Sequence, residues 1–288
     1  MSPTLRAAFW MVGAIVSFTS MAVAGRAVSH QLDTFEIMLF RSLVGIGLVL
    51  LVGRAAGTLG QVRTDRLGLH TARNLAHFAG QNLWFHALTL ITLAQVFALE
   101  FTSPIWVMVL AALFLGERLT GRRLLAVALG FAGALVVARP GAGGDPLGLA
   151  LAALSAVCFA GSIVSTKRLT RTDTIFCILF WLTLMQAGMG ALAAGWDGDL
   201  VLPSVRTLPW AVLVGCAGLV AHTCLTNALA VAPATVVTPM DFARLPVIAV
   251  VGVLLYAEPL SPAVFLGAAL IFAGNYLNVL GSKPSGTT

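Results

Sequence analysis

Long apolar stretches separated by short polar segments make up nearly the whole chain. There are ten such runs, at about residues 7–25, 36–53, 71–90, 94–115, 122–138, 146–165, 174–195, 208–231, 235–257 and 262–281. Each is close to the roughly 20 residues that a helix needs to cross a hydrocarbon layer about 30 Å thick. The pattern therefore predicts an all-α integral membrane protein with ten transmembrane helices, short loops and no soluble domain.

The composition supports a membrane protein. Hydrophobic residues make up 59% of the chain and charged residues 10%, whereas soluble domains carry about 25% charged residues. The first run follows only Arg6 and has no small-residue cleavage pattern after it, so we expect a retained helix and not a signal peptide. All four cysteines lie inside apolar runs without CxxC spacing, which predicts neither a disulfide framework nor a metal site. We expect no cofactor.

A short charged segment leads to an internal repeat. The segment "FLGERLTGRRLL" at 114–125 has a counterpart that keeps only its Glu, "LYAEPLSPAVFL" at 255–266. Aligning Glu117 with Glu258 sets an offset of 141 residues, and the same offset brings "LGFAGALVV" at 129–137 onto "LIFAGNYLN" at 270–278. Matches at one fixed offset predict a duplicated unit. We therefore expect two five-helix repeats, residues 1–141 and 142–288.

The number of helices in each repeat fixes their relation. Because five is odd, the second copy must enter the bilayer from the opposite side, so the repeats are expected to be inverted. Inverted repeats recur in secondary transporters, where cargo binds near the bilayer midplane between two pseudo-equivalent units. Channels and membrane enzymes can also be duplicated, so the pattern favours a transporter without excluding them.

Positive charge is distributed unevenly between alternate loops. With a cytoplasmic N terminus, the inside segments carry eleven Lys and Arg residues and the outside loops three, Arg26, Arg139 and Arg206. The positive-inside rule then places both termini in the cytoplasm. The basic residues form no continuous patch, so no nucleic-acid partner is expected. Glu117 and Glu258 are best explained as anchors at helix ends, with coupling to ion movement as the alternative.

The stretch "ALTLITLAQVFALEFTSPIWVMVLAALFLGERLTGRRLLAVALGFAGALVV" resembles the EamA-type unit of the drug/metabolite transporter superfamily. The second half repeats it in a weaker form, so the resemblance covers essentially the whole chain. It implies a ten-helix carrier of the bacterial inner membrane that exports amino acids or other small metabolites, and the YddG-type aromatic amino acid exporters are of similar size. One departure is that the offset carries Pro104 onto Leu245, whereas the second copy has its proline at Pro246.

Polar residues inside the third run are candidates for binding cargo. Asn74, His77 and Gln81 recur at spacings of three and four, which places them on one helix face. Trp84 or Phe85 lies one turn beyond. Such side chains in a membrane helix need a partner or a wet cavity.

The eighth run offers an equivalent polar face. The offset matches His222 to Gln81 and Asn227 to His86, and Thr226 lies one turn after His222. We expect the two faces to meet near the midplane and to bind a small-molecule substrate. The alternative is that these groups form hydrogen bonds between helices and serve packing.

Aromatic side chains within the spans are further candidates, because they could stack on an aromatic or apolar cargo. Facing lipid or a neighbouring helix is the alternative for each. The candidates are Trp84, Phe101, Trp106, Phe159 and Trp181.

Four charged residues lie inside predicted spans, where they could form ion pairs. The repeat matches Glu100 to Asp241, and Arg244 follows Asp241 on the same helix face. We favour an ion pair between Asp241 and Arg244, and uptake of a proton by either carboxylate is the alternative. Arg41 is expected either to extend to the outer surface or to neutralise a carboxylate, of the protein or of the cargo.

Prolines in spans four and nine are expected to bend both helices. Pro104, Pro239 and Pro246 remove backbone donors there. A secondary carrier that works by alternating access is thus the leading interpretation, most plausibly for aromatic or hydrophobic amino acids, with another metabolite such as a vitamin or nucleoside as the alternative. The chain has no Walker A, HExxH or GxSxG motif, which disfavours direct ATP coupling and a membrane enzyme. A channel is disfavoured only weakly, and the oligomeric state is not indicated.

Overall fold

The computed structural model describes residues 1–91, 93–138, 145–196, 198–256 and 262–280, and this part of the chain contains helices and no strand. Glu258, Arg139 and Lys283, which entered the repeat and orientation arguments, lie outside the described residues. The elements are α1 (Pro3–Val28), α2 (Thr34–Ala55), η1 (Leu59–Gln61), α3 (Leu67–Leu90), α4 (Leu93–Glu100), α5 (Ser103–Leu115), α6 (Gly121–Ala138), α7 (Pro146–Leu169), α8 (Ile175–Ala194), α9 (Leu208–Val231), α10 (Ala234–Met240), η2 (Asp241–Ala243), α11 (Arg244–Tyr256) and α12 (Pro262–Leu280).

Eight of the ten predicted runs correspond to one helix each, and the fourth and ninth are interrupted. The fourth is divided into α4 and α5, with Pro104 in the first turn of α5. The ninth is divided by η2, which follows Pro239 inside α10. Proline cannot donate the backbone hydrogen bond that a continuous helix requires. The expected bends are therefore present, and in both spans the helix restarts.

The internal repeat is visible in where the helices begin. Adding 141 to the first residue of α2, α3, α4, α5 or α6 gives the first residue of α8, α9, α10, α11 or α12. The two restarted helices obey this rule too, because Ser103 of α5 corresponds to Arg244 of α11. The first helices of the two repeats, α1 and α7, match less closely: α1 begins at Pro3, which corresponds to position 144, but α7 begins at Pro146. The predicted boundary between the two units falls within residues 139–144, outside the described residues.

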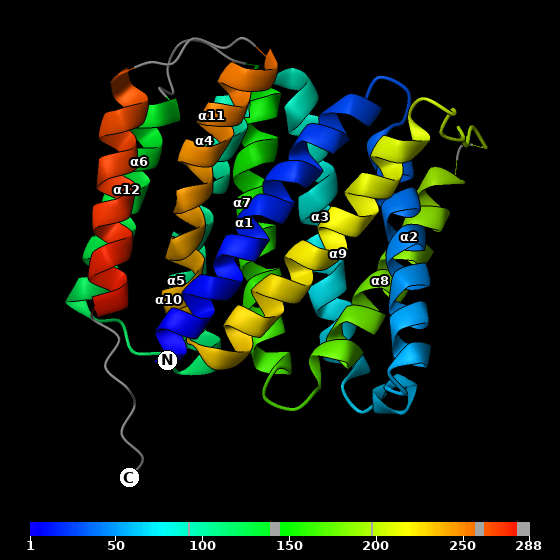
Figure 1. Cartoon of the computed structure of the whole chain (residues 1–288), viewed down its shortest axis with the longest axis horizontal. Coiled ribbons are helices and arrows are strands. Elements are labelled where there is room, and N and C mark those ends of the chain that lie inside the picture. Colours follow the sequence, from blue (N-terminus) through cyan, green and yellow to red (C-terminus); the bar gives the residue numbers. More distant parts are fainter. Residues whose placement is uncertain (92, 139–144, 197, 257–261, 281–288) are drawn as a thin grey trace.

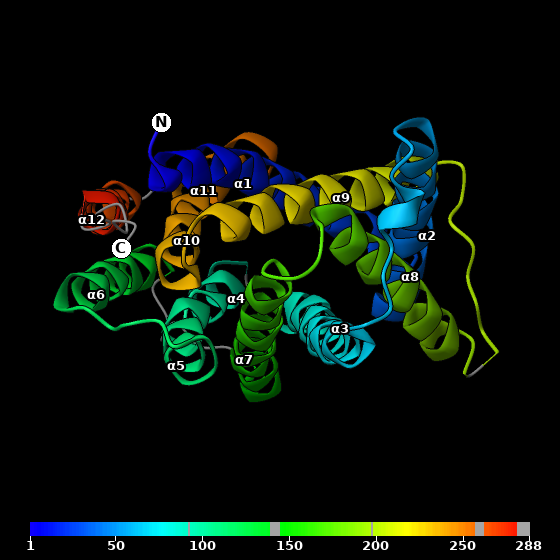
Figure 2. The ribbon, with the colours of Figure 1, turned by 90° about the horizontal axis from the view of Figure 1, so that it is seen from below.

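The helices form two rows (Figure 2). One row contains α12, α10 with α11, α1 and α9, and the other contains α6, α4 with α5, α7 and α3, while α2 and α8 stand together at one end. Within the rows, α1 packs extensively on α9, and the equivalent helices α7 and α3 pack in the same way. The pairs α6 with α12 and α2 with α8 join equivalent helices. Exchanging the two repeats thus exchanges the two rows.

The arrangement is that of a multi-pass membrane protein. In Figure 1, α1 begins at the lower edge of the molecule and α12 ends on that same side, as an even number of passes requires. Six described segments combine the length and hydropathy to cross a membrane: α1, α2, α7, α8, α9 and Ala234–Leu255. The fold is therefore the predicted all-α membrane architecture of two inverted five-helix repeats.

Glu117 shows what the charged segment at 114–125 does in the structure. Gly116 ends α5 in the left-handed conformation at φ 68°, which glycine adopts without strain. The Glu117 carboxylate then accepts hydrogen bonds from the backbone N–H groups of Ala234 (2.9 Å) and Thr235 (3.1 Å) at the start of α10. A carboxylate there satisfies unpaired donors and interacts favourably with the helix dipole. The expected helix-end anchor is thus a link from the first repeat to the second.

Candidate functional site

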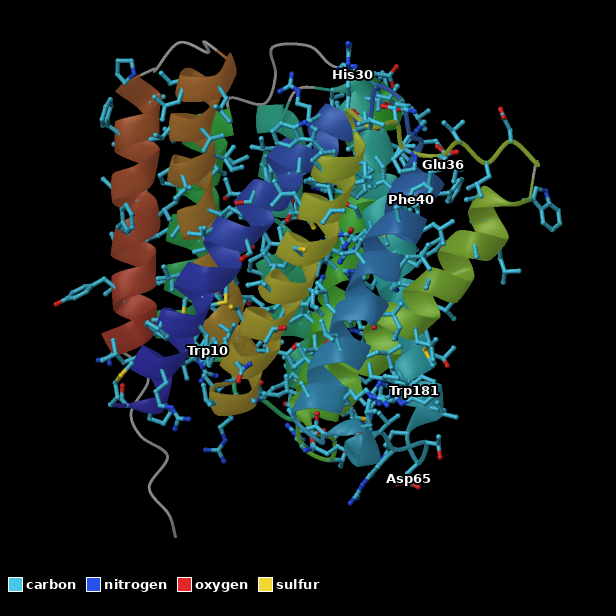
Figure 3. All side chains as sticks on the ribbon, turned by 45° about the vertical axis from the view of Figure 1, so that its right-hand side comes forward. Trp10, His30, Glu36, Phe40, Asp65 and Trp181 are labelled. Carbon is cyan, nitrogen blue, oxygen red and sulfur yellow. The ribbon has the colours of Figure 1, made fainter. Side chains whose placement is uncertain are left out.

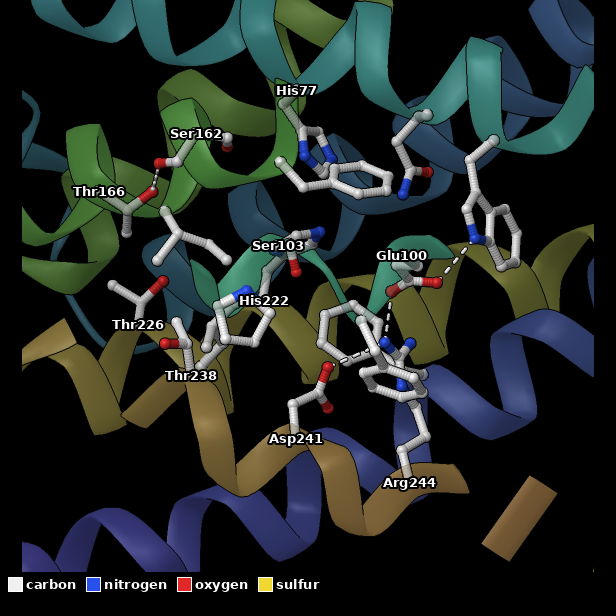
Figure 4. Close-up of a pocket in the computed structure, with 18 of the residues that line it drawn as sticks. His77, Glu100, Ser103, Ser162, Thr166, His222, Thr226, Thr238, Asp241 and Arg244 are labelled. Carbon is white, nitrogen blue, oxygen red and sulfur yellow. Dashed lines mark hydrogen bonds and ion pairs between the residues drawn. The ribbon is translucent and has the colours of Figure 1, made fainter. Parts of the chain in front are cut away.

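A cavity lies between the two rows of helices, at the level of both helix interruptions (Figure 4). Its space is about 900 Å³, counting narrow gaps between side chains and the part open to the outside. Helices α1, α3, α7 and α9 and the two interrupted spans line it, and among the described side chains none of its lining residues comes from α2, α6, α8 or α12. The lining residues are Met11, Phe18, Met21, Arg73, His77, Gln81, Trp84, Glu100, Phe101, Ser103, Pro104, Phe159, Ser162, Ile163, Thr166, His222, Leu225, Thr226, Thr238, Asp241 and Arg244.

The lining is pseudo-symmetric at several positions. Residues separated by the repeat offset both face the cavity in the pairs Phe18 and Phe159, Gln81 and His222, Glu100 and Asp241, and Ser103 and Arg244. Equivalent positions in inverted repeats meet at the axis that relates them, so a central site is the place where such pairs are expected. The cavity is therefore built by both repeats together.

Three charged residues form a linked group at the helix interruptions. Arg244, the first residue of α11, donates to the carboxylates of Glu100 and Asp241, and its contact with Asp241 is 2.8 Å. Trp84 Nε1 donates to the other oxygen of Glu100 at 2.7 Å. The expected ion pair between Asp241 and Arg244 is thus present, and it is extended by Glu100 from the opposite repeat.

Aromatic rings surround the Arg244 guanidinium. Its Cζ atom lies 5.3 Å from the centre of the Phe18 ring, 5.4 Å from Phe97 and 5.5 Å from Phe101. A cation over aromatic faces within about 6 Å is stabilised by the ring quadrupole. Two carboxylates and three rings therefore compensate the charge of this buried arginine and connect α1, α4 and α11.

Two histidines meet in the cavity as the two predicted polar faces come together. The rings of His77 and His222 lie 4.7 Å apart, edge to face at 86°. Phe159 packs beside His77 at 6.2 Å and Phe18 beside His222 at 5.5 Å. In the described part of the chain, neither His77 Nε2 nor His222 Nε2 has a hydrogen-bond partner. Both are thus buried polar atoms whose hydrogen-bonding capacity is unused.

Two further arginines lie beside the histidines. Arg73 is one turn before His77 on α3 and lines the cavity, where its Nε donates to Thr166 Oγ1 at 3.1 Å. Arg41 of α2 donates to Gln81 Oε1 at 2.8 Å. Arg41 neither reaches the surface, since it is 6% exposed, nor pairs with a carboxylate among the described residues. Both earlier expectations for Arg41 within the protein are therefore wrong.

Several predicted candidates lie away from this cavity. Phe85 and His86 face a separate pocket at the end of α1 and α3, because the helix turns them away from Trp84. Trp106 is 43% exposed on the outer surface of α5. Trp181 donates to the carbonyl oxygen of Arg63 near the lower edge of the molecule (Figure 3). Asn227 donates to the carbonyl of Thr223 within its own helix.

Sequence reasoning missed Arg73 and the hydroxyl groups of Ser162, Thr166 and Thr238. The spacing Arg73, His77, Gln81 could have revealed the first, since residues four apart share a helix face. The hydroxyl residues carry no such signal, because serine and threonine are common in membrane helices and bond to the preceding turn. Thr166, for example, donates to the carbonyl of Ser162 at 2.8 Å.

A possible metal-binding group lies outside the cavity. His70, Asp173 and Cys177 each offer one ligand atom, and these atoms lie within 4.8 Å of one another. Structural zinc sites in proteins are almost always four-coordinate, so this group would need one more ligand. The cavity itself is suited to holding an organic molecule, with aromatic faces, hydrogen-bond donors and charged groups in one place.

Comparisons with known proteins agree with this architecture. A riboflavin transporter of Brucella anthropi is 33% identical over 218 residues, which cover 74% of this chain and 77% of that protein. A riboflavin transporter of Rhizobium johnstonii is 31% identical and covers 93% of this chain and 89% of its own. An S-adenosylmethionine uptake transporter of Rickettsia bellii is 22% identical over 95% of this chain and 93% of its own.

A solved crystal structure shares the fold. It superposes with a TM-score of 0.80 at 21% identity, covering 95% of this chain and 96% of the other. The sequence model of the EamA-like transporter family matches residues 5–139 and again residues 146–280, one match for each set of five helices. The chain, a multi-pass membrane protein with a duplicated five-helix unit, therefore belongs to the EamA-like transporter family.

Proposed function

We propose that this protein is a secondary carrier that binds one small metabolite in the cavity between the two rows and moves it by alternating access. The observation that carries the proposal is the position of the cavity at both helix interruptions. Discontinuous helices at a repeat interface are where secondary transporters bind their cargo. The two predicted units, residues 1–141 and 142–288, would exchange roles between inward-open and outward-open states.

For the cargo, we propose riboflavin or a related flat heteroaromatic vitamin. Relatives with 33% and 31% identity are riboflavin transporters, so the vitamin alternative is better supported than the amino acid. The lining fits a flat ring system, because Trp84, Phe101 and Phe159 supply aromatic faces. The unpartnered nitrogen atoms of His77 and His222 and the Arg73 side chain can form hydrogen bonds with the carbonyl and ring nitrogen atoms of such a molecule.

The orientation proposed from the loops completes this function. The excess of Lys and Arg in alternate loops supports cytoplasmic termini and insertion in the inner membrane of a bacterial cell. The names of the relatives do not agree on direction, since one is an uptake transporter for S-adenosylmethionine and another, from Pseudomonas aeruginosa, is a pseudopaline exporter. A carrier without an energy source runs in either direction according to the gradient.

Counterflow in proteoliposomes tests this function. Vesicles with purified protein are loaded with unlabelled riboflavin, and the entry of labelled riboflavin is followed after dilution. A carrier should give transient accumulation above the level in empty vesicles, because internal cargo returns the binding site to the outside. Parallel vesicles loaded with phenylalanine and threonine test the amino-acid alternative. Accumulation of an amino acid but not of riboflavin would overturn the proposed cargo, and entry without stimulation by internal cargo would overturn the carrier mechanism.

A further inference from the structure

Two buried arginines beside the cavity have no negatively charged partner among the described residues. Arg41 is 6% exposed and Arg73 is 2% exposed. Their described hydrogen bonds go to neutral groups only, Gln81 Oε1 and Met38 Sδ for Arg41, and Thr166 Oγ1 and Asn74 Oδ1 for Arg73. A buried cation without a counter-charge is costly, and inside a membrane such residues mark functional sites.

Arg244, the third buried arginine, does have negatively charged partners. Arg244 has two carboxylates and three aromatic rings around it. Glu100 and Asp241, the acidic residues of the cavity, are both engaged in that group. The described ion pairs include neither Arg41 nor Arg73, although Asp241 Oδ1 remains without a partner.

The two copies of the repeat differ at the positions of Arg41 and Arg73. Lining positions such as Glu100 and Asp241 keep their character in both copies, whereas the positions equivalent to Arg41 and Arg73 are Leu182 and Val214. The second copy also makes room for Arg41, because a Cβ atom on Gly218 would lie 2.6 Å from its Nε atom. Arg244 also occurs in only one copy, because its equivalent is Ser103. What distinguishes Arg41 and Arg73 is therefore the lack of a carboxylate partner among the described residues, whereas Arg244 has two.

The geometry concentrates the two charges near the histidines. Arg73 lies one turn before His77 on α3 and lines the same cavity as both histidines, and Arg41 and His222 line a smaller pocket together. Both histidines are buried, and their Nε2 atoms have no partner. Thr166, which Arg73 contacts, lies on the opposite side of the cavity from Glu100 and Arg244 (Figure 4). An anion beside Arg73 would therefore lie on the other side of the cavity from Glu100.

We propose that this side of the cavity is an anion-binding subsite in which Arg73 contacts the anion directly. His77 and His222 lie beside the anion. Arg41, which donates to Gln81, adds a second positive charge nearby. The ligand is an anion, either a carboxylate or phosphate group of the cargo or a small inorganic anion that accompanies a neutral cargo. This proposal rests on the proposed function, because the subsite is part of the cavity that is proposed to bind the cargo.

A thermal unfolding series in detergent tests the subsite without requiring transport. Inorganic phosphate and chloride are titrated separately at constant ionic strength, held by methanesulfonate. The wild-type unfolding temperature should rise and saturate. Arg73→Gln should abolish the rise, and it should unfold at a higher temperature than wild type in anion-poor buffer, because it removes an uncompensated charge. Arg73→Lys should keep a weaker response, since it retains the charge but not the planar fork.

Exposed Arg122 provides the matched control, so Arg122→Gln should respond like wild type. An equal rise in wild type, Arg73→Gln and Arg122→Gln would mean general screening and would overturn the proposal. So would the absence of any rise in wild type, or a low starting stability of Arg73→Gln that Arg73→Lys restores without an anion response. That last result would assign Arg73 a purely structural role.

The source of the anion is decided by two flavins that differ by one phosphate group. If the cargo carries the anion, flavin mononucleotide should stabilise wild type at a concentration about tenfold or more below that of riboflavin, as expected for one charge-assisted hydrogen bond. Arg73→Gln should remove this difference. If a separate anion accompanies the cargo, riboflavin counterflow should instead increase with chloride or phosphate. If wild type shows no riboflavin counterflow but its unfolding temperature still rises with the anion, riboflavin is refuted as the cargo and the anion subsite is retained.

Discussion

Replacing Glu100 by glutamine tests the charged group at the helix interruptions. The side chain of Glu100 is 11% exposed, receives Trp84 Nε1 on one oxygen and Arg244 on the other, and links the two repeats. Glutamine keeps an acceptor for Trp84 but presents an uncharged amide to Arg244. A hydrogen bond to a charged group contributes about 1.5–3 kcal/mol, and Asp241 remains to hold Arg244. We therefore expect Glu100→Gln to lower the free energy of unfolding by about 1.5–3 kcal/mol.

Chemical unfolding in a mild detergent, followed by circular dichroism, measures this change. Exposed Asp65 gives the control, and Asp65→Asn should stay within about 0.5 kcal/mol of wild type. A double mutant with Arg244→Gln completes the cycle. Its cost should differ from the sum of the single mutants by about 0.5–3 kcal/mol, because the two side chains are in contact. Additive costs, or a Glu100→Gln cost no larger than that of the surface control, would refute the coupling that the structure indicates.

Three other substitutions have defined outcomes. In Gly133→Ala, the new Cβ would lie 2.6 Å from the carbonyl oxygen of Gly267, so it should force α6 and α12 apart and cost about 1–3 kcal/mol in the same unfolding assay. Gly188→Ala, which meets no atom within 4 Å, should not do so; equal effects of the two would contradict the close packing. Glu117→Gln weakens the cap on α10 and should speed amide hydrogen exchange at the start of that helix, with a cost of about 1 kcal/mol; unchanged exchange would argue against the cap. His222→Ala should reduce counterflow while the protein still elutes as a folded, detergent-solubilised species, and wild-type flux would contradict a place for His222 in the binding site.

Much of the fold could be predicted from the sequence because its determinants are local and repeated. Apolar length sets each span, and a fixed offset carries Ser103 onto Arg244, where both α5 and α11 begin. What the sequence could not give was the packing of α1 with the helices of the other repeat, since hydropathy does not say which helices are neighbours. Nor did it show that Glu117 would cap a helix more than a hundred residues later.

The candidate site was predictable where helix periodicity applies. Spacing on α3 placed Asn74, His77 and Gln81 on one face; His77 and Gln81 line the cavity, and Asn74 is not among its lining residues. Periodicity did not decide between Trp84 and Phe85, because adjacent residues point about 100° apart and the rotation of a helix depends on its neighbours. The partners of Arg41 were also beyond reach, since they depend on packing between α2 and α3 and on the missing side chain at Gly218.

The central claim is that cargo binds in the cavity between the two rows. Riboflavin binding to variants of two tryptophans, one inside the cavity and one outside it, tests this claim most directly. Trp84 lines the cavity, whereas Trp106 is 43% exposed on the outer surface. Riboflavin binding to purified Trp84→Ala and Trp106→Ala, followed by quenching of riboflavin fluorescence, should be weakened about tenfold or more in the first and stay within about twofold of wild type in the second, since an aromatic stacking contact contributes about 1–3 kcal/mol. Equal affinity of the two variants, or loss confined to Trp106→Ala, would contradict a binding site between the rows.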